Sequence, residues 1–319
     1  MDLSIIIVNW NSKDYLRNCI ASILDNTHKI EFEIIVIDAA SFDGCDEMLR
    51  QCFPQVRYIQ SNENVGFAKA NNAAFQISQG KSVLFLNPDT ELLGPAIAIM
   101  HQHLQTLTDV GAVGCKLLNS DMTLQTSSVQ AFPTILNQVI DTEALRQHFP
   151  RWQFWGMRPL FDQTEMPTEV DAISGACLMV RRSVFEKVGM FSAYYFMYSE
   201  DVDLCFKIRS SGLKNYYIPT AVIVHHGGGS SRQATVSNFS NVMLMESLWR
   251  FFVTNRSFVY GCFYRMSMMI VSVLRIIVAI LLWQACALPD NKATWKSAFQ
   301  KWRVKLRWTL GKERWIKDY

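Results

Sequence analysis

The sequence lacks the markers of several protein classes. Its eight cysteines are scattered and include no CxxC pair, which argues against a disulfide framework and a zinc site and favours a reduced compartment. Charged residues make up only 18% of the chain and hydrophobic residues 50%, so it is not a disordered protein. Internal repeats and low-complexity segments are also missing, and the composition is that of a globular protein with a sizeable core.

A secretory leader is not visible either. A signal peptide would begin with a basic region, whereas Met1-Asp2 leads directly into a short apolar run at residues 3–8. We expect this run to be a buried strand and the N-terminal domain to stay in the cytoplasm. A nucleotidyltransferase would need a basic, glycine-rich phosphate loop near the N-terminus, and residues 8–13 do not contain one.

What the first hundred residues do contain is an alternation of apolar runs and amphipathic stretches. Strands are predicted at 4–8, 33–37, 56–59 and 82–86, and helices at 13–24 and 66–78. Continuously apolar strands separated by helices predict an α/β fold: a Rossmann-like, mainly parallel sheet with helices on both faces. Ligands of such sheets bind at the carboxyl ends of the strands, where Asn9, Asp38, Asn87 and Asp89 stand.

The rest of the chain changes character twice. Residues 116–168 are expected to be irregular and to lie over a cleft, with Trp152, Phe154, Trp155 and Phe161 among them. Further strands are predicted at 172–180 and 221–224, and helices at 182–188 and 200–211. Long apolar helices begin after about residue 238. The expected division is therefore a first domain over 1–237 and a helical region over 238–319.

Three polar motifs could carry chemistry, and each has a plain structural alternative. Asn87-Pro88-Asp89 could hold a divalent cation against a diphosphate, or form an ordinary turn. The acids at 200, 201 and 203 could supply a general base, or only suit the dipole of a helix start. His225-His226 before three glycines could supply a metal ligand, although a lone histidine is usually structural.

Together, in this order and spacing, these motifs resemble the family 2 inverting glycosyltransferases of GT-A fold, in particular the bacterial rhamnosyltransferase-like branch. The resemblance covers about residues 3–235. It rests on SIIIVNWN (4–11), IVID before SxDG (35–44), NxNVGFAKANN (62–72), NPD (87–89), SGAC (174–177), EDVD (200–203) and HxGGxS (225–230). It implies that residues 1–237 form a GT-A catalytic domain.

The resemblance also implies roles for single residues. The nucleotide-sugar would contact Val8, Asn9, Asp38, Asn64, Gly66, Asn71, Asn87 and Asp89, with Asp38 at the nucleotide base. Asp89 and His225 would hold Mg²⁺ or Mn²⁺, with His226 as the runner-up ligand. Asp201 would be the catalytic base, and Glu200 and Gly175 would contact the acceptor. The chain departs from the family at Ala39, often Asn, and at Phe191-Ser192-Ala193, often Phe-Asp-Glu.

The implied activity is transfer of a sugar from a nucleotide-sugar to a lipid-linked or polysaccharide acceptor, in bacterial cell-surface glycan synthesis. A metal would stabilise the leaving diphosphate, and a single displacement would invert the anomeric centre. dTDP-L-rhamnose is the leading donor, ahead of UDP-hexoses and UDP-galactofuranose. Two rival interpretations stay open: another sugar-nucleotide enzyme, and a non-catalytic nucleotide-sugar-binding or scaffolding protein.

Residues 266–288 are apolar over a length that could span a bilayer, with a single charge at Arg275. Apolar residues contribute roughly −0.3 to −0.6 kcal/mol each, and a central Arg costs about +2.5 to +3.5 kcal/mol, so insertion is only slightly favourable. Spanning would also leave the basic tail outside, against the positive-inside tendency. A helix lying in the interface, or a re-entrant pair that includes residues 243–263, avoids this.

The tail at 289–319 has nine Lys or Arg against three acids, together with four of the nine Trp. This composition favours an anionic membrane surface over nucleic acid. We therefore expect peripheral or monotopic attachment to the cytoplasmic face of the plasma membrane. The alternative is a helical hairpin packed on the catalytic domain, or used as the contact of a homodimer.

Overall fold

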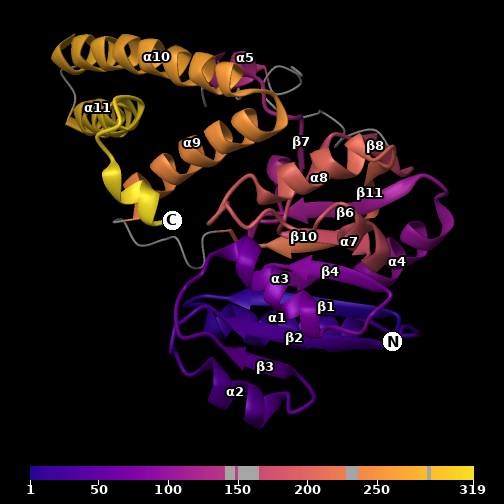
Figure 1. Cartoon of the computed structure of the whole chain (residues 1–319). Coiled ribbons are helices and arrows are strands. Elements are labelled where there is room, and N and C mark those ends of the chain that lie inside the picture. Colours follow the sequence, from indigo (N-terminus) through magenta and orange to yellow (C-terminus); the bar gives the residue numbers. More distant parts are fainter. Residues whose placement is uncertain (141–147, 150–164, 228–235, 286–288) are drawn as a thin grey trace.

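The computed structural model describes residues 1–140, 148–149, 165–227, 236–285 and 289–319. It consists of one large sheet with helices on both faces and long C-terminal helices beside it (Figure 1). The aromatic residues expected over a cleft, Trp152, Phe154, Trp155 and Phe161, lie outside the described residues.

The first half of the sheet is parallel, as the apolar runs predict. β1 (Leu3–Asn9) lies between β2 (Phe32–Asp38) and β4 (Ser82–Leu86), and β3 (Arg57–Gln60) flanks β2. β1 and β4 are almost wholly buried because helices cover both of their faces. The register sets Val8 beside Ile37 and Asn9 beside Asp38, so the polar ends of β1 and β2 meet at one edge.

The second half of the sheet is mixed. β10 (Cys177–Arg181) runs antiparallel to β4 and to β6 (Val110–Leu118). β11 (Lys214–His225) is parallel to β6 and antiparallel to β5 (Thr90–Leu92) and β8 (Thr168–Val170). This pairing places the end of β11 beside the turn that follows β4, so segments more than 130 residues apart in the chain meet there.

The strand predicted at 172–180 is interrupted in the structure. β9 (Ala172–Ile173) pairs with β7 (Val129–Gln130) in a separate small sheet, and only β10 belongs to the large one. Between them the chain turns, because Cys177 N donates to Ser174 O and Gly175 N donates to a side chain of α8 (Glu200–Ser210). The strand predicted at 221–224 is the end of the longer β11.

Two hydrophobic cores cover the two faces of the sheet. One contains α1 (Lys13–Asn26), α2 (Cys45–Cys52) and α4 (Ala96–Thr106). The other contains α3 (Phe67–Ile77), α7 (Arg182–Lys187) and α8, together with the first C-terminal helix, α9 (Val236–Asn255). Val242, Met243, Phe251 and Phe252 of α9 are fully buried in that core. α9 begins at Val236, so the predicted boundary at 237/238 falls within its first turn, and the helix packs into the core on this face of the sheet.

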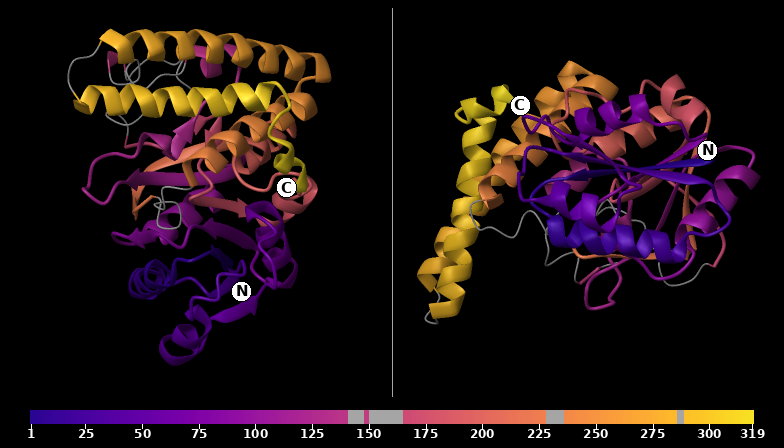
Figure 2. Two further views of the ribbon diagram at one scale, coloured as in Figure 1. Left: turned by 90° about the vertical axis from the view of Figure 1, so that its left-hand side faces the viewer. Right: turned by 90° about the horizontal axis from the view of Figure 1, so that it is seen from below.

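The last two helices, α10 (Phe258–Ala285) and α11 (Pro289–Thr309), lie side by side and are followed by the short η3 (Arg314–Asp318) (Figure 2). α10 is long and apolar enough to cross a membrane, and it is the one such helix among the described residues. Its outer stripe is apolar and exposed: Phe263, Met266, Ile270, Val273, Ile277 and Leu281.

Arg275 does not belong to that stripe. Its guanidinium donates to the Val139 carbonyl of α5 (Ile135–Ile140) at 3.0 Å and lies 4.5 Å from the ring centre of Trp302 on α11. The free-energy cost that a central Arg adds to membrane insertion therefore does not apply to the outer face of α10. One face of α10 packs on protein, and only the outer stripe is available to lipid.

Candidate active site

At the ends of β1 and β2, several hydrogen bonds hold the carboxylate of Asp38 in place. The carboxylate of buried Asp38 accepts from Asn9 Nδ2 at 2.8 Å, from Gln60 Nε2 at 2.8 Å and from Ser41 N at 3.0 Å. Burial raises the pKa of Asp38, but these hydrogen bonds outweigh it and hold the pKa below its usual range. Asp38 is thus a fixed, ionised group where the family resemblance expects the nucleotide base.

The glycine loop before α3 is locked onto the loop that leads to α8. Asn64 Oδ1 accepts from Gly66 N at 3.0 Å, and Phe67 N donates to Phe196 O at 2.8 Å. Buried Asn71 donates to the Phe67 carbonyl at 2.9 Å. Asn64, Gly66 and Asn71, predicted for the nucleotide, therefore shape the start of α3 and fix it against the loop before α8.

Asp89 and His225 meet although they are far apart in the chain. β11 sets His225 beside Thr90, and His225 Nε2 lies 3.3 Å from Asp89 Oδ1 and 3.2 Å from Asn87 Nδ2. Both side chains are largely buried. Adjacent ligand atoms of an octahedral Mg²⁺ ion are about 3 Å apart. The spacing and the donor types therefore fit a hard divalent cation.

The neighbouring His226 points elsewhere. Its Nδ1 lies 2.8 Å from Ser120 Oγ, its Nε2 lies 3.1 Å from Glu91 Oε1, and its ring packs against Tyr15. The backbone N of His226 donates to the Asp89 carbonyl at 2.9 Å, but of the two imidazole rings it is that of His225 that reaches the Asp89 carboxylate.

A second gathering of ligand-type atoms lies at Asp38, Asp43 and Cys45, all within 4.8 Å of one another. Asp43 accepts from Lys13 N and Cys45 N, and these bonds fix the start of α2. Asp38 also accepts hydrogen bonds from Asn9, Gln60 and Ser41, so the oxygens of this group are already engaged with protein donors. The pair Asp89 and His225 is the better candidate for a metal.

Two carboxylates open α8. Asp201 accepts from Gly175 N at 2.7 Å and from Val202 N at 2.8 Å, and a side chain on Gly175 would lie 3.2 Å from Asp201 Cβ. Gly175, predicted to contact the acceptor, therefore holds the predicted base directly. Burial raises the pKa of Asp201. Burial and the neighbouring Asp201 charge raise the pKa of Glu200, whose Oε2 is buried and has no hydrogen-bond partner in the described part of the chain.

One cavity of about 500 Å³ joins these groups. Asn87 and His225 line it together with Gly175, Glu200 and Asp201. A buried, unpartnered carboxyl that faces a cavity needs a hydrogen-bond partner from a ligand. The cavity thus brings together His225, one of the two residues predicted to hold a metal, Asp201, the predicted base, and Glu200, predicted to contact the acceptor.

The match to known proteins agrees with this arrangement. Residues 4–189 match the family model described as Glycosyl transferase family 2. The chain belongs to this family. One relative is the N-acetylglucosaminyl-diphospho-decaprenol L-rhamnosyltransferase of Mycobacterium tuberculosis. The two sequences are 27% identical over 251 residues, which cover 75% of this chain and 80% of that protein.

A second family 2 relative is the rhamnosyltransferase WbbL of Escherichia coli K12, 24% identical over 241 residues, 72% of this chain and 84% of that protein. Among solved structures, a mannosyltransferase from Pyrobaculum calidifontis, in complex with GDP-Man and Mn²⁺, superimposes on this chain with a TM-score of 0.59. The sequence identity is 15%, and the superposition covers 99% of this chain and 87% of that one. The predicted GT-A fold is confirmed, and the enzyme class of this chain is glycosyltransferase.

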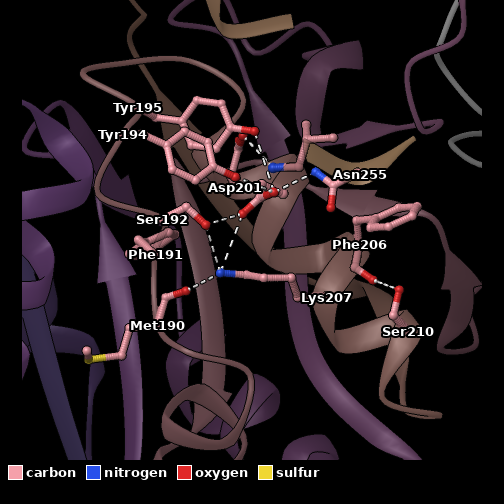
Figure 3. Close-up of polar contacts among 12 residues, drawn as sticks. Met190, Phe191, Ser192, Tyr194, Tyr195, Asp201, Phe206, Lys207, Ser210 and Asn255 are labelled. Atoms are coloured by element: carbon pink, nitrogen blue, oxygen red, sulfur yellow. Dashed lines mark hydrogen bonds and ion pairs between the residues drawn. The ribbon is translucent and has the colours of Figure 1, made fainter. Parts of the chain in front are cut away.

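In this glycosyltransferase, Asp203, the third acid at the start of α8, has a structural role. Buried Asp203 accepts from Ser192 Oγ at 2.6 Å and from Asn255 Nδ2 at 2.7 Å, and pairs with Lys207 at 3.4 Å. In Figure 3, dashed lines from the labelled Ser192, Lys207 and Asn255 lead to one unlabelled carboxylate, which the contacts identify as that of Asp203; the three partners come from the loop, from α8 and from the end of α9. Ser192, one of the departures from the family, thus ties its loop to α8.

Sequence reasoning missed Gln125. Its Nε2 donates to Asn119 Oδ1 at 3.1 Å and approaches His225 O, so its Oε1 faces His225 Nδ1 at 2.7 Å. Nδ1 must therefore carry a proton, which directs Nε2 toward Asp89. Nothing in the sequence links Gln125 to His225. Gln125 lies in a stretch without a regular hydrophobic pattern, just before the short η1 (Thr126–Ser128) and β7.

We predict that Gly66→Ala destabilises the glycosyltransferase. Gly66 has a φ of +85°, and an added Cβ would lie 2.3 Å from the Phe196 carbonyl oxygen. Strain and overpacking together should lower the free energy of unfolding by about 2–5 kcal/mol in denaturant titrations. Gly212→Ala is the matched control, because Gly212 has a φ of +89° but open space around it. Equal losses in the two variants would show that the Phe196 contact is unimportant.

Proposed function

We propose that this glycosyltransferase transfers a hexose, with inversion and metal assistance, from a nucleotide-sugar to a lipid-linked or polysaccharide acceptor of the bacterial cell surface. L-rhamnose from dTDP-L-rhamnose is the leading donor. The observation that carries the proposal is the single cavity that joins Asp201 and Glu200 to His225 and Asn87. The two rhamnosyltransferase relatives support the choice of sugar.

Asp201 is the proposed base. Its Oδ1 and Oδ2 accept from Val202 N and Gly175 N, which keep the carboxylate oriented at the cavity wall. Its pKa, raised by burial, makes it a stronger base toward an acceptor hydroxyl than an exposed aspartate would be. The raised pKa of Glu200 lets that group stay protonated and donate to another acceptor oxygen. Because no covalent nucleophile is required, the attack occurs in one step and inverts the anomeric carbon.

The leaving diphosphate is proposed to lie near Asp89 and His225. A divalent cation bound there would supply positive charge for the phosphate oxygens. Gln125 would keep His225 Nε2 directed at Asp89, and Asp38 would receive donors of the nucleotide base. The carboxylate of Asp89 and the phosphate oxygens of the donor are the ligand types that suit Mg²⁺ and Mn²⁺, and His225 would add one nitrogen.

A panel of nucleotide-sugars tests the proposal. Purified protein is incubated with dTDP-L-rhamnose, UDP-hexoses and UDP-galactofuranose, and the released nucleoside diphosphate is measured. The highest rate is expected with dTDP-L-rhamnose, and the anomeric configuration of the product, read by NMR, should be opposite to that of the donor. Absence of release from every donor would favour a non-catalytic binding protein, and retention would contradict the single displacement.

We propose further that the enzyme attaches to the anionic cytoplasmic face of the plasma membrane, peripherally or monotopically, through α10 and α11. The exposed apolar stripe of α10 would lie at the level of the headgroups, and the exposed basic side chains Lys296, Lys301 and Arg303 of α11 would meet anionic lipid. A homodimer would bury the same apolar stripe of α10, and the vesicle-binding test below distinguishes this alternative from membrane attachment.

We predict that replacing Lys296, Lys301 and Arg303 by Gln weakens binding to phosphatidylglycerol vesicles. At about 1 kcal/mol for each basic residue near the surface, the loss is roughly 100-fold at low salt. Binding is measured by vesicle sedimentation of the whole chain, since removal of α9 would expose the catalytic core.

The control replaces Arg17, Lys29 and Lys187, exposed basic residues of the catalytic domain, by Gln. The same change in net charge should leave vesicle binding within about threefold. If both triple variants bind equally well, or if the native chain ignores anionic vesicles and sediments as a dimer, the membrane proposal is wrong.

A further inference from the structure

The cavity beside Asp201 has an apolar wall that proton transfer does not require. Leu244 and Leu248 of α9 line it together with Met197 and Phe67. Leu248 is nearly buried, but Leu244 is 40% exposed in a stretch where Met243 and Met245 are buried. Because burial of apolar surface is favourable, an apolar ligand group that covers Leu244 would gain affinity.

α9 is fixed relative to the two acids. Buried Ser247 donates to the Met197 carbonyl at 2.9 Å, and Met197 stands only three residues before Glu200. Trp308 of α11 donates to Glu246 Oε2 at 2.9 Å and holds α9 from the other side. Leu244 and Leu248 are four residues apart and so lie on the same side of the helix. The apolar wall therefore stands in a defined position beside Asp201.

The polar part of the lining is uncharged apart from the acids and His225. The remaining described polar side chains are hydroxyls and amides, namely Asn87, Ser127, Gln130, Gln138, Ser174, Tyr198 and Ser199. No Lys or Arg is among the lining residues that the structure describes. On the side of Leu244 and Leu248, the described lining therefore offers apolar contacts to an alkyl group and no Lys or Arg to a phosphate.

We propose that Leu244 and Leu248 form an apolar subsite for an uncharged alkyl-type substituent of the acceptor, held beside the hydroxyl that receives the sugar. The inference rests on the proposed function, because it takes the cavity as the acceptor site. It assigns α9, the first helix of the C-terminal region, a part in acceptor selection.

The test uses methyl, butyl and octyl β-D-glucopyranosides below their micelle concentrations. Their binding to the whole chain is measured by NMR titration without donor. Full burial of a methylene strengthens binding about three- to fourfold, so the butyl glucoside should bind at least tenfold more tightly than the methyl glucoside. Leu244→Asn should reduce this ratio to within about twofold, and Leu244→Met should preserve it.

Leu93→Asn is the matched control, since Leu93 is an exposed leucine that does not line the cavity. A native chain that binds all three glucosides equally, or a Leu244→Asn variant with an unchanged ratio, would overturn the subsite. Release of nucleoside diphosphate is measured in parallel samples of the same variants to which dTDP-L-rhamnose is added. A retained chain-length dependence without any release would instead count against the proposed transfer, so the two failures are distinguishable.

Discussion

Asp201→Asn should abolish most transfer while leaving the protein folded. The amide keeps the size of the side chain but cannot take a proton from the acceptor, and loss of a general base lowers turnover by about 10²-fold or more. Donor binding should change by less than about twofold, because Asp201 lies at the Gly175 side of the cavity and not at Asp38. Turnover is measured as product formed, and donor binding by calorimetry.

Glu200→Gln is the matched control, one residue away and more deeply buried than the half-buried Asp201. It keeps a hydrogen-bonding group, so we expect a raised KM for the acceptor and a smaller loss of turnover. If Asp201→Asn keeps near-native turnover, or if Glu200→Gln loses more turnover than Asp201→Asn, then Glu200 is the base and Asp201 the residue that contacts the acceptor.

The pH profile gives a second check on the base. Burial raises the pKa of Asp201, and only the ionised carboxylate can accept a proton. Activity should therefore fall as the pH drops through this raised pKa, at a higher pH than an ordinary aspartate would give. The quantity measured is kcat/KM for the acceptor as a function of pH. An acid limb at the usual aspartate pKa would mean that Asp201 is more solvated than the structure indicates.

Removal of the metal should have an effect of similar size. We predict that excess EDTA stops transfer and that added Mg²⁺ or Mn²⁺ restores it. Asp89→Ala and His225→Ala should each weaken Mn²⁺ binding, measured by electron paramagnetic resonance, because each removes one of two ligand atoms that lie 3.3 Å apart. Loss of a single metal ligand or of its orienting partner typically weakens metal binding by about 10–100-fold or more.

His226→Ala is the control for position, since that ring bonds to Ser120 and Glu91. It should bind Mn²⁺ normally, whereas Gln125→Leu should weaken binding by leaving His225 unoriented. Full activity in EDTA would contradict metal assistance, and a defect confined to His226→Ala would move the ligand by one residue.

Motifs that lie on one continuous strand or turn could be located from the sequence. The apolar runs at 4–8, 33–37 and 82–86 became β1, β2 and β4, because a buried parallel strand needs apolar residues on both faces. Asn9 and Asp38 follow from the same pattern. The break in the region at 172–180 could not be predicted, because two short strands on either side of Gly175 have the composition of one longer strand.

The contact between α9 and the cavity beside Asp201 could not be predicted from the sequence either. An apolar helix that packs on protein has the same composition as one that lies against lipid, and α9 does the first whereas α10 leaves a stripe exposed. Arg275, which counted against insertion, proved to be bonded to α5 and stacked on Trp302. Such neighbours are set by tertiary packing.

The sequence by itself determined the α/β class, the polar residues at the strand ends and the family to which the enzyme belongs, because these depend on local periodicity and on short ordered motifs. Only the tertiary structure decided which of these residues share one cavity. The pairing of β11 with β5 brings His225 to Asp89, the turn at Gly175 fixes Asp201, and Gln125 orients His225. These contacts join residues 26 to 136 positions apart, and such long-range pairing follows from how the sheet closes and leaves no local trace in the sequence.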